Sequence, residues 1–164
     1  MSGQQNNTKS LLQILCDSLV QKNVLLMAIE QKSKEQEAIV KKDDFTFKEI
    51  DENMDAKAEL INKLTLLDNG FETLYAKLRE ELLANKENYK VEIQQIQNLI
   101  AEITARGASI EAVEARNKAA IENYFSREKK ELQSKKSASM AAYSYYKTAK
   151  NINCVAPQFM DHKN

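Results

Sequence analysis

The stretch KKDDFTFKEI, residues 41–50, decides the fold, because it marks the end of one helix and the start of the next. Thr46 and Glu49 have the spacing of a capping box, in which each side chain accepts a hydrogen bond from the backbone N–H of the other residue. Phe45 and Ile50 flank the cap at positions where they can pack together as a hydrophobic staple. Since only about four residues separate the two helices, we expect an antiparallel hairpin.

Before this link, apolar residues recur at spacings of three and four from Leu12 to Ile29 and predict a helix over about 9–41. Residues 1–8 are polar and are expected to form a disordered N-terminus. The same seam also contains three polar residues, Lys22, Ser33 and Gln36, which reduce its apolar surface. A partner helix could therefore substitute at these positions.

After the link, the apolar stripe runs from Phe47 to Ile103 and predicts a single helix over 46–106, about 90 Å long at 1.5 Å per residue. Asp68-Asn69-Gly70 is a turn motif between strands, but the apolar spacing passes through it and favours a continuous or kinked helix. Arg106-Gly107 is typical of a helix end. Ser109 can then cap a third helix over about 109–148.

The expected fold class is therefore all-α: an elongated antiparallel helical hairpin or three-helix bundle with coiled-coil-like packing and a flexible C-terminal tail. We expect residues 9–150 to form a single elongated helical domain. Residues 151–164 contain the only proline and no helical period, so they are predicted to be the tail.

Composition argues against an enzyme. The 164 residues include one histidine, near the C-terminus, two distant cysteines and no glycine-rich phosphate-binding motif. No catalytic, cofactor or metal site is therefore expected. The N-terminus lacks the layout of a signal peptide and the apolar runs are short, so we expect a cytoplasmic protein without membrane insertion.

The net charge of zero hides an uneven distribution. Residues 1–114 hold 14 basic and 20 acidic side chains, whereas residues 115–164 hold 10 basic and 4 acidic ones. The basic half is a solvated helix face, or it docks on the acidic bundle or on an acidic partner. No nucleic-acid partner is expected, because no recognised binding motif accompanies the charge.

The C-terminal region offers candidate binding residues. Tyr143, Tyr145 and Tyr146 cluster where the apolar stripe is thin, so they are either interface anchors or side chains that close the end of the bundle. Val155 and Phe159 belong to a short apolar motif in a polar tail, which is either a docking peptide or an overhang without a role.

One stretch of the chain resembles the amino-terminal hairpin of FlgN-type flagellar export chaperones. It comprises residues 25–68, LLMAIEQKSKEQEAIVKKDDFTFKEIDENMDAKAELINKLTLLD. The shared features are the glutamates that end the first helix, the KDD link and the run KAELINKL at 57–64. EARNKAAIENYF at 114–125 resembles the third helix of that family, and the C-terminal end is similar in its tyrosines and proline. The related FliT-type chaperones are the alternative subtype.

This resemblance implies a cytosolic bacterial chaperone, monomeric or homodimeric. It would bind C-terminal helical segments of hook–filament junction proteins, keep them unassembled and deliver them to export-gate components. The family binds its clients towards the C-terminus. The resemblance therefore implies that the client-binding residues of this chain are Tyr143, Tyr145, Tyr146, Val155 and Phe159. The alternative from another class is a structural coiled-coil protein that self-associates.

Overall fold

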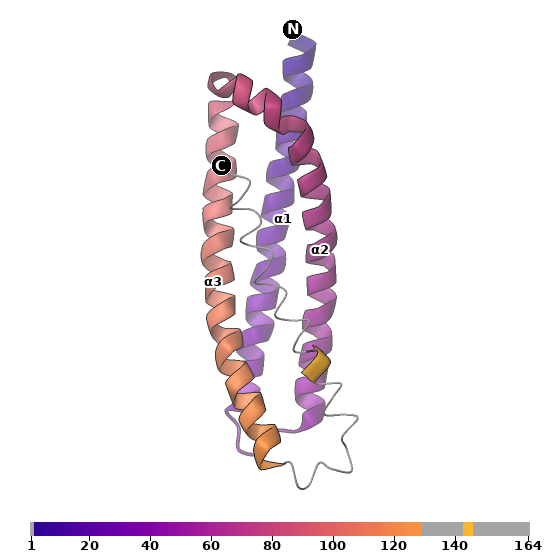
Figure 1. Ribbon diagram of the computed structural model, residues 1–164, viewed down its shortest axis with the longest axis vertical. Coiled ribbons are helices and arrows are strands. Elements are labelled where there is room, and N and C mark those ends of the chain that lie inside the picture. The colour runs from indigo at the N-terminus through magenta and orange to yellow at the C-terminus, as the bar shows by residue number, and fades with distance from the viewer. Residues whose placement is uncertain (1, 129–142, 146–164) are drawn as a thin grey trace.

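The chain forms an elongated bundle of three long helices, and the computed structural model describes residues 2–128 and 143–145 (Figure 1). These residues contain no strand, which confirms the predicted all-α fold class. The elements are α1 (Ser2–Val40), α2 (Phe47–Ala84), the short 3-10 helix η1 (Lys86–Tyr89) and α3 (Lys90–Arg127). Within the described residues, α2 and α3 approach each other less closely than either approaches α1.

The predicted hairpin between the first two helices is present, and its capping box is formed. The backbone N–H of Thr46 donates to Glu49 Oε2 (2.9 Å), and the backbone N–H of Glu49 donates to Thr46 Oγ1 (3.3 Å). The bond from Thr46 lowers the pKa of the Glu49 carboxyl. Phe45 and Ile50 are buried in one cluster, as a hydrophobic staple requires. α2 consequently returns antiparallel along α1 (Figure 1).

The second helix is shorter than predicted. Instead of continuing to residue 106, α2 ends at Ala84, and Asn85 leaves the helix with φ −127° and ψ 42°. The Asn85 N–H still donates to the Glu81 carbonyl (3.1 Å), after which η1 reverses the chain into α3. The sequence pattern conceals this break, because Leu82 and Tyr89 are seven residues apart, which is also the spacing of two helical turns.

The helix end predicted at Arg106-Gly107 is absent, and α3 runs unbroken through these residues to Arg127. Gly107 is buried in the same seam as Ile103 and Ile110, where α3 packs against α1. Glycine inside a helix costs only about 1 kcal/mol, and burial of the flanking isoleucines outweighs that cost. The expected third helix over 109–148 therefore starts earlier, at Lys90, and the predicted C-terminal part of that helix falls largely outside the described residues.

The first helix begins earlier than predicted, at Ser2, so residues 2–8 are helical rather than disordered. The Ser10 hydroxyl donates to the Asn6 carbonyl one turn before it (3.0 Å), and Thr8 is buried. These first turns extend past the point where α2 crosses α1 (Figure 1). Polar composition misled the sequence prediction, because helical backbone hydrogen bonds do not require apolar side chains.

The turn motif Asp68-Asn69-Gly70 lies inside α2, which confirms the prediction of a continuous helix. Gly70 is exposed, and a Cβ atom added there would meet nothing within 4 Å. Glycine is therefore an unfavourable helix residue at this position, and no close packing requires the absence of a side chain.

We expect Gly70→Ala to raise the free energy of unfolding by about 0.5–1 kcal/mol, because alanine has less backbone entropy to lose in the unfolded chain. Urea denaturation monitored by circular dichroism measures the change. Gly3→Ala is the matched control: its Cβ also meets nothing, but it lies in the first turn of α1, where the gain should be smaller. A destabilised Gly70→Ala variant would contradict the continuous helix.

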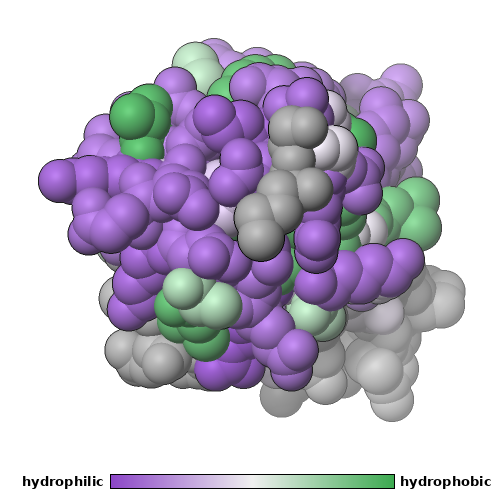
Figure 2. Space-filling view, turned by 90° about the horizontal axis from the view of Figure 1, so that it is seen from above, coloured by the Kyte–Doolittle hydropathy of each residue, from purple (hydrophilic) through white to green (hydrophobic). Residues whose placement is uncertain are grey.

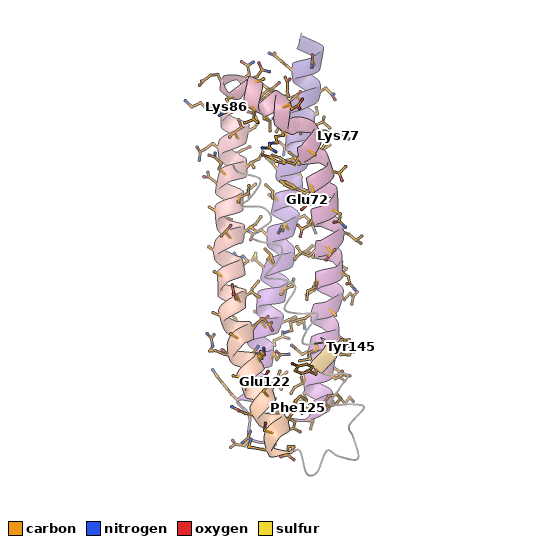
Figure 3. The ribbon with its side chains drawn as sticks, in the orientation of Figure 1. Glu72, Lys77, Lys86, Glu122, Phe125 and Tyr145 are labelled. Carbon is orange, nitrogen blue, oxygen red and sulfur yellow. The ribbon has the colours of Figure 1, made fainter. Side chains whose placement is uncertain are left out.

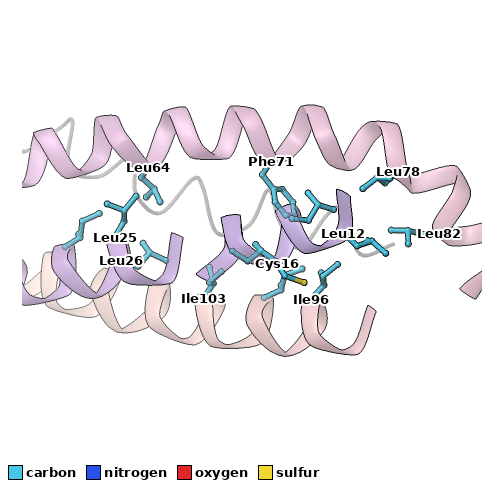
Figure 4. Packing of buried hydrophobic residues seen from close by; sticks show 14 of the residues in the cluster. Leu12, Cys16, Leu25, Leu26, Leu64, Phe71, Leu78, Leu82, Ile96 and Ile103 are labelled. Atoms are coloured by element: carbon cyan, nitrogen blue, oxygen red, sulfur yellow. The ribbon is translucent and has the colours of Figure 1, made fainter. Parts of the chain in front are cut away.

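Two clusters of buried apolar side chains fill the bundle. The larger one follows α1 from Leu12 to Ile29 and joins residues of α2, α3 and η1, the last of which contributes Tyr89. Figure 4 shows part of this cluster, including Phe71 of α2 and Ile96 of α3. The smaller one lies towards the opposite end and consists of Phe45, Ile50, Met54 and Ile121. Between them, all three helices contribute polar side chains.

Candidate functional site

A layer of buried polar side chains separates the two apolar clusters. Two come from each helix, and all are at most 6% exposed: Ser33, Gln36, Asn53, Lys57, Glu114 and Asn117. The sequence predicts that Ser33 and Gln36 weaken a seam that a partner helix could fill. That interpretation was wrong, because these positions are filled by polar partners from the same chain.

Lys57 and Glu114 form the centre of this polar layer. Lys57 Nζ donates to Glu114 Oε1 (2.6 Å) and to Gln36 Oε1 (3.3 Å), so one ammonium group joins all three helices. The Ser33 hydroxyl donates to the same carboxylate oxygen. Burial lowers the pKa of Lys57, whereas the Glu114 carboxylate opposes this shift. Desolvation is therefore the larger effect on Lys57, and the neighbouring carboxylate offsets only part of it.

Amide side chains complete the polar layer. Gln36 Nε2 donates to Asn53 Oδ1 (3.0 Å), and Asn53 Nδ2 donates to the Lys32 carbonyl (2.9 Å). Asn117 Nδ2 donates to the Ser33 carbonyl (2.9 Å). Sliding one helix past another by a turn would break these bonds in a buried setting, so the polar layer selects one register of the three helices.

A second buried ion pair lies within the larger apolar cluster. Lys22 Nζ is 2.9 Å from Asp68 Oδ1, and the two residues are 1% and 5% exposed. Burial lowers the pKa of Lys22 to about 8 and raises the pKa of Asp68 to about 6, in each case against the attraction of the partner. Desolvation therefore exceeds the gain from the ion pair. Lys22, like Ser33, is not an open position in the seam.

A groove of about 370 Å³ lies where α2, η1 and α3 meet. Phe71, Tyr75 and Leu82 of α2 line it together with Ile93, Ile96 and Ile100 of α3. Its end at η1 carries three charged side chains: Lys86, Glu87 and Lys90. Figure 3 shows Lys86 at that end of the bundle.

The sequence does not predict this groove, because most of the apolar residues in its two walls belong to one continuous apolar stripe. The two halves of the stripe come to lie opposite each other only when the chain reverses at Asn85. The available signal was the polar run NKEN at 85–88, whose two asparagines disfavour a helix interior.

Two of the five residues predicted to bind a client are described. Tyr143 and Tyr145 are 43% and 37% exposed, and a hydrogen bond with Asp55 of α2 raises the pKa of Tyr145. Figure 3 shows Tyr145 beside the N-terminal half of α2, away from the groove. Tyr146, Val155 and Phe159 lie outside the described residues.

Arg116 of α3, one of the basic side chains of residues 115–164, forms an ion pair with α1. Arg116 Nε donates to Glu37 Oε2 on α1 (2.8 Å), which lowers the pKa of Glu37. The Arg116 side chain is largely exposed, so this ion pair adds little stability. It nevertheless places positive charge of α3 against the acidic part of the chain.

One helix, Gly3–Val40, is long and apolar enough by length and composition to cross a membrane. The core helix of a soluble protein and a signal sequence near the N-terminus pass the same test, and one face of α1 lies in the larger apolar cluster. Among the described residues, no group of three or more histidine, cysteine or acidic side chains could hold a metal ion.

Comparisons with protein families, curated proteins and solved structures found no match to this chain.

Proposed function

We propose that this protein is a cytoplasmic chaperone that holds an amphipathic helical segment of a client protein in the groove between α2 and α3. The observation that carries the proposal is the groove itself, whose two walls belong to antiparallel helices. Its floor is made of side chains that are already buried in the core, and its more exposed apolar lining consists of Tyr75, Leu83 and Ile93. An amphipathic helix placed there would bury its apolar face against both walls. It would also complete a four-helix arrangement around the existing core.

The charges at the η1 end favour one orientation of the client. Lys86 and Lys90 outnumber Glu87 there, and the C-terminus of a helix carries partial negative charge. A client helix with its C-terminal end at η1 would place that charge beside the two lysines. Acidic side chains in its last turn would strengthen the contact.

The resemblance of residues 25–68 and 114–125 to FlgN-type flagellar export chaperones supports a proposal for the client. It points to C-terminal helical segments of hook–filament junction proteins, kept unassembled until they reach the export gate. Tyr145 adds a second contact point in this proposal. Asp55, its partner, is 16 residues from Phe71, about 24 Å along α2, so one client helix of ordinary length could touch both.

The test uses the full chain and a labelled peptide carrying the C-terminal helix of a hook–filament junction protein. Leu83 lines the groove and is 56% exposed, so Leu83→Glu should place a charge in the client's apolar contact without unfolding the bundle. We expect fluorescence anisotropy to show binding weakened about tenfold or more.

Leu66→Glu is the matched control, because Leu66 is 73% exposed on the same helix and lies outside the groove. Its affinity for the peptide should equal that of the unsubstituted chain. Circular dichroism should report the same helix content for both variants. If the two substitutions weaken binding equally, or if the peptide does not bind the unsubstituted chain, the proposal fails.

A further inference from the structure

The helix α1 carries a second seam on the face opposite the core. Its residues follow alternating spacings of four and three, and all of them are exposed: Gln13, Asp17, Val20, Val24, Met27, Gln31, Lys34 and Ala38. The three apolar members at the centre, Val20, Val24 and Met27, are 49%, 51% and 51% exposed. A surface helix whose only apolar face is already buried does not need this second stripe.

The charges at the two ends of this outer seam are complementary. Asp17 precedes the apolar centre and Lys34 follows it. When a second copy of α1 lies antiparallel with the two-fold axis midway between Val24 and Met27, Val24 of each copy meets Met27 of the other. In the same register Asp17 of each copy meets Lys34 of the other. The contacts Val24–Met27 and Asp17–Lys34 therefore each occur twice, as an isologous interface requires, while Val20 of each copy meets Gln31 of the other.

We infer that the outer seam of α1 is an interaction surface for a second copy of this chain, which forms an antiparallel homodimer through α1. Three apolar side chains per copy make a small patch, so the dimer is weak and the charge pairs set its register. A membrane surface fits less well, because Asp17 and Lys34 lie in line with the apolar residues rather than on a separate polar face.

The dimer leaves the groove accessible. The outer seam lies on the side of α1 that faces away from α2 and α3, and Figure 1 shows α1 behind the space between those helices. The end of the bundle nearest the N-terminus is covered mainly by hydrophilic side chains (Figure 2), so this end does not favour stacking of bundles into filaments. Two copies joined back to back would present two grooves on opposite sides.

Sedimentation equilibrium of the full chain over a range of concentrations tests the inference. The unsubstituted protein should show a reversible monomer–dimer equilibrium that weakens at high salt. Asp17→Lys or Lys34→Asp alone creates two like-charge contacts per dimer, so each should raise the dissociation constant about tenfold. The combined variant Asp17→Lys/Lys34→Asp exchanges the charges and should restore the dimer.

Lys77→Asp is the matched control, because it makes the same change of charge at an exposed position of α2 and should leave the equilibrium unchanged. A protein that is monomeric at every concentration would overturn the inference. So would a dimer that both single variants leave intact. Cosedimentation with neutral or anionic lipid vesicles that Val24→Glu abolishes would instead assign the seam to a membrane. None of these results depends on binding of the client peptide, so the proposed function can stand or fall separately.

Discussion

Glu114→Leu is expected to lower the free energy of unfolding by about 3–5 kcal/mol, the largest effect of any substitution considered for this chain. The carboxylate accepts hydrogen bonds from Lys57 and Ser33 in the polar layer. Without it, the Lys57 ammonium would remain at a fully buried position with only the weaker contact to Gln36. Urea denaturation followed by circular dichroism measures the loss.

The double variant Lys57→Met/Glu114→Leu separates the cost of an orphaned charge from the value of the pair. Because an apolar replacement of a buried ion pair is often neutral or stabilising by about 1–4 kcal/mol, we expect the double variant to recover the stability that Glu114→Leu loses. Glu111→Leu is the control, since Glu111 is exposed one turn earlier on α3. It should change stability by less than about 0.5 kcal/mol. Equal effects of Glu111→Leu and Glu114→Leu would show that the pair is not buried.

Lys22→Met/Asp68→Leu is expected to raise the free energy of unfolding at neutral pH by about 1–4 kcal/mol. The pair is buried, and the directions of both pKa shifts indicate that its desolvation exceeds its mutual attraction. Met and Leu would extend the surrounding apolar cluster instead. Lys48→Met/Glu52→Leu is the matched control, because that ion pair is exposed on α2 and contributes little.

The gain from Lys22→Met/Asp68→Leu should depend on pH. The pKa of Asp68 is about 6 in the folded chain against an ordinary 3.8, so the folded state binds more protons between these values. Stability contributed by Asp68 is therefore present at low pH and is lost as pH rises to about 6. The pKa of Lys22 is about 8 against 10.5, so the unfolded state binds more protons there and stability returns above pH 8.

The double variant should consequently exceed the unsubstituted chain most between about pH 6 and 8. Urea denaturation at about pH 4, 7 and 10 samples the three regimes. Glu72 lies near both groups and adds a negative charge that the variant retains, so it does not create the difference. A gain that is constant across these pH values would mean that Lys22 and Asp68 are not desolvated in the folded chain.

Several features of the fold could be read from neighbouring residues alone. The hairpin link depends on Thr46 and Glu49, three residues apart, and on the staple of Phe45 and Ile50. The continuity of α2 through Gly70 follows from apolar spacing over two turns on each side. These predictions were correct because the atoms that decide them are brought together by the helix itself.

Other features required the tertiary structure. Ser33 and Glu114 are 81 residues apart, and Lys57 and Glu114 are 57 apart, so nothing local identifies them as partners. From the sequence alone, the polar residues in the seam of α1 are interpreted as positions where a partner helix could bind. In the structure they form hydrogen bonds with side chains of α2 and α3. The same limit applies to Gly107, whose cost within α3 is outweighed by the packing around it.

The sequence by itself determined an all-α chain, one capped antiparallel hairpin and the apolar faces of its helices, because helical periodicity and capping are local. Only the tertiary structure decided where the second helix ends. The reversal at Asn85–Tyr89 places the two halves of one apolar stripe on opposite sides of a groove, while the pattern of seven residues runs on unchanged. The role of the polar residues in the α1 seam was likewise decided only by the packing of all three helices, because their hydrogen-bond partners come from α2 and α3.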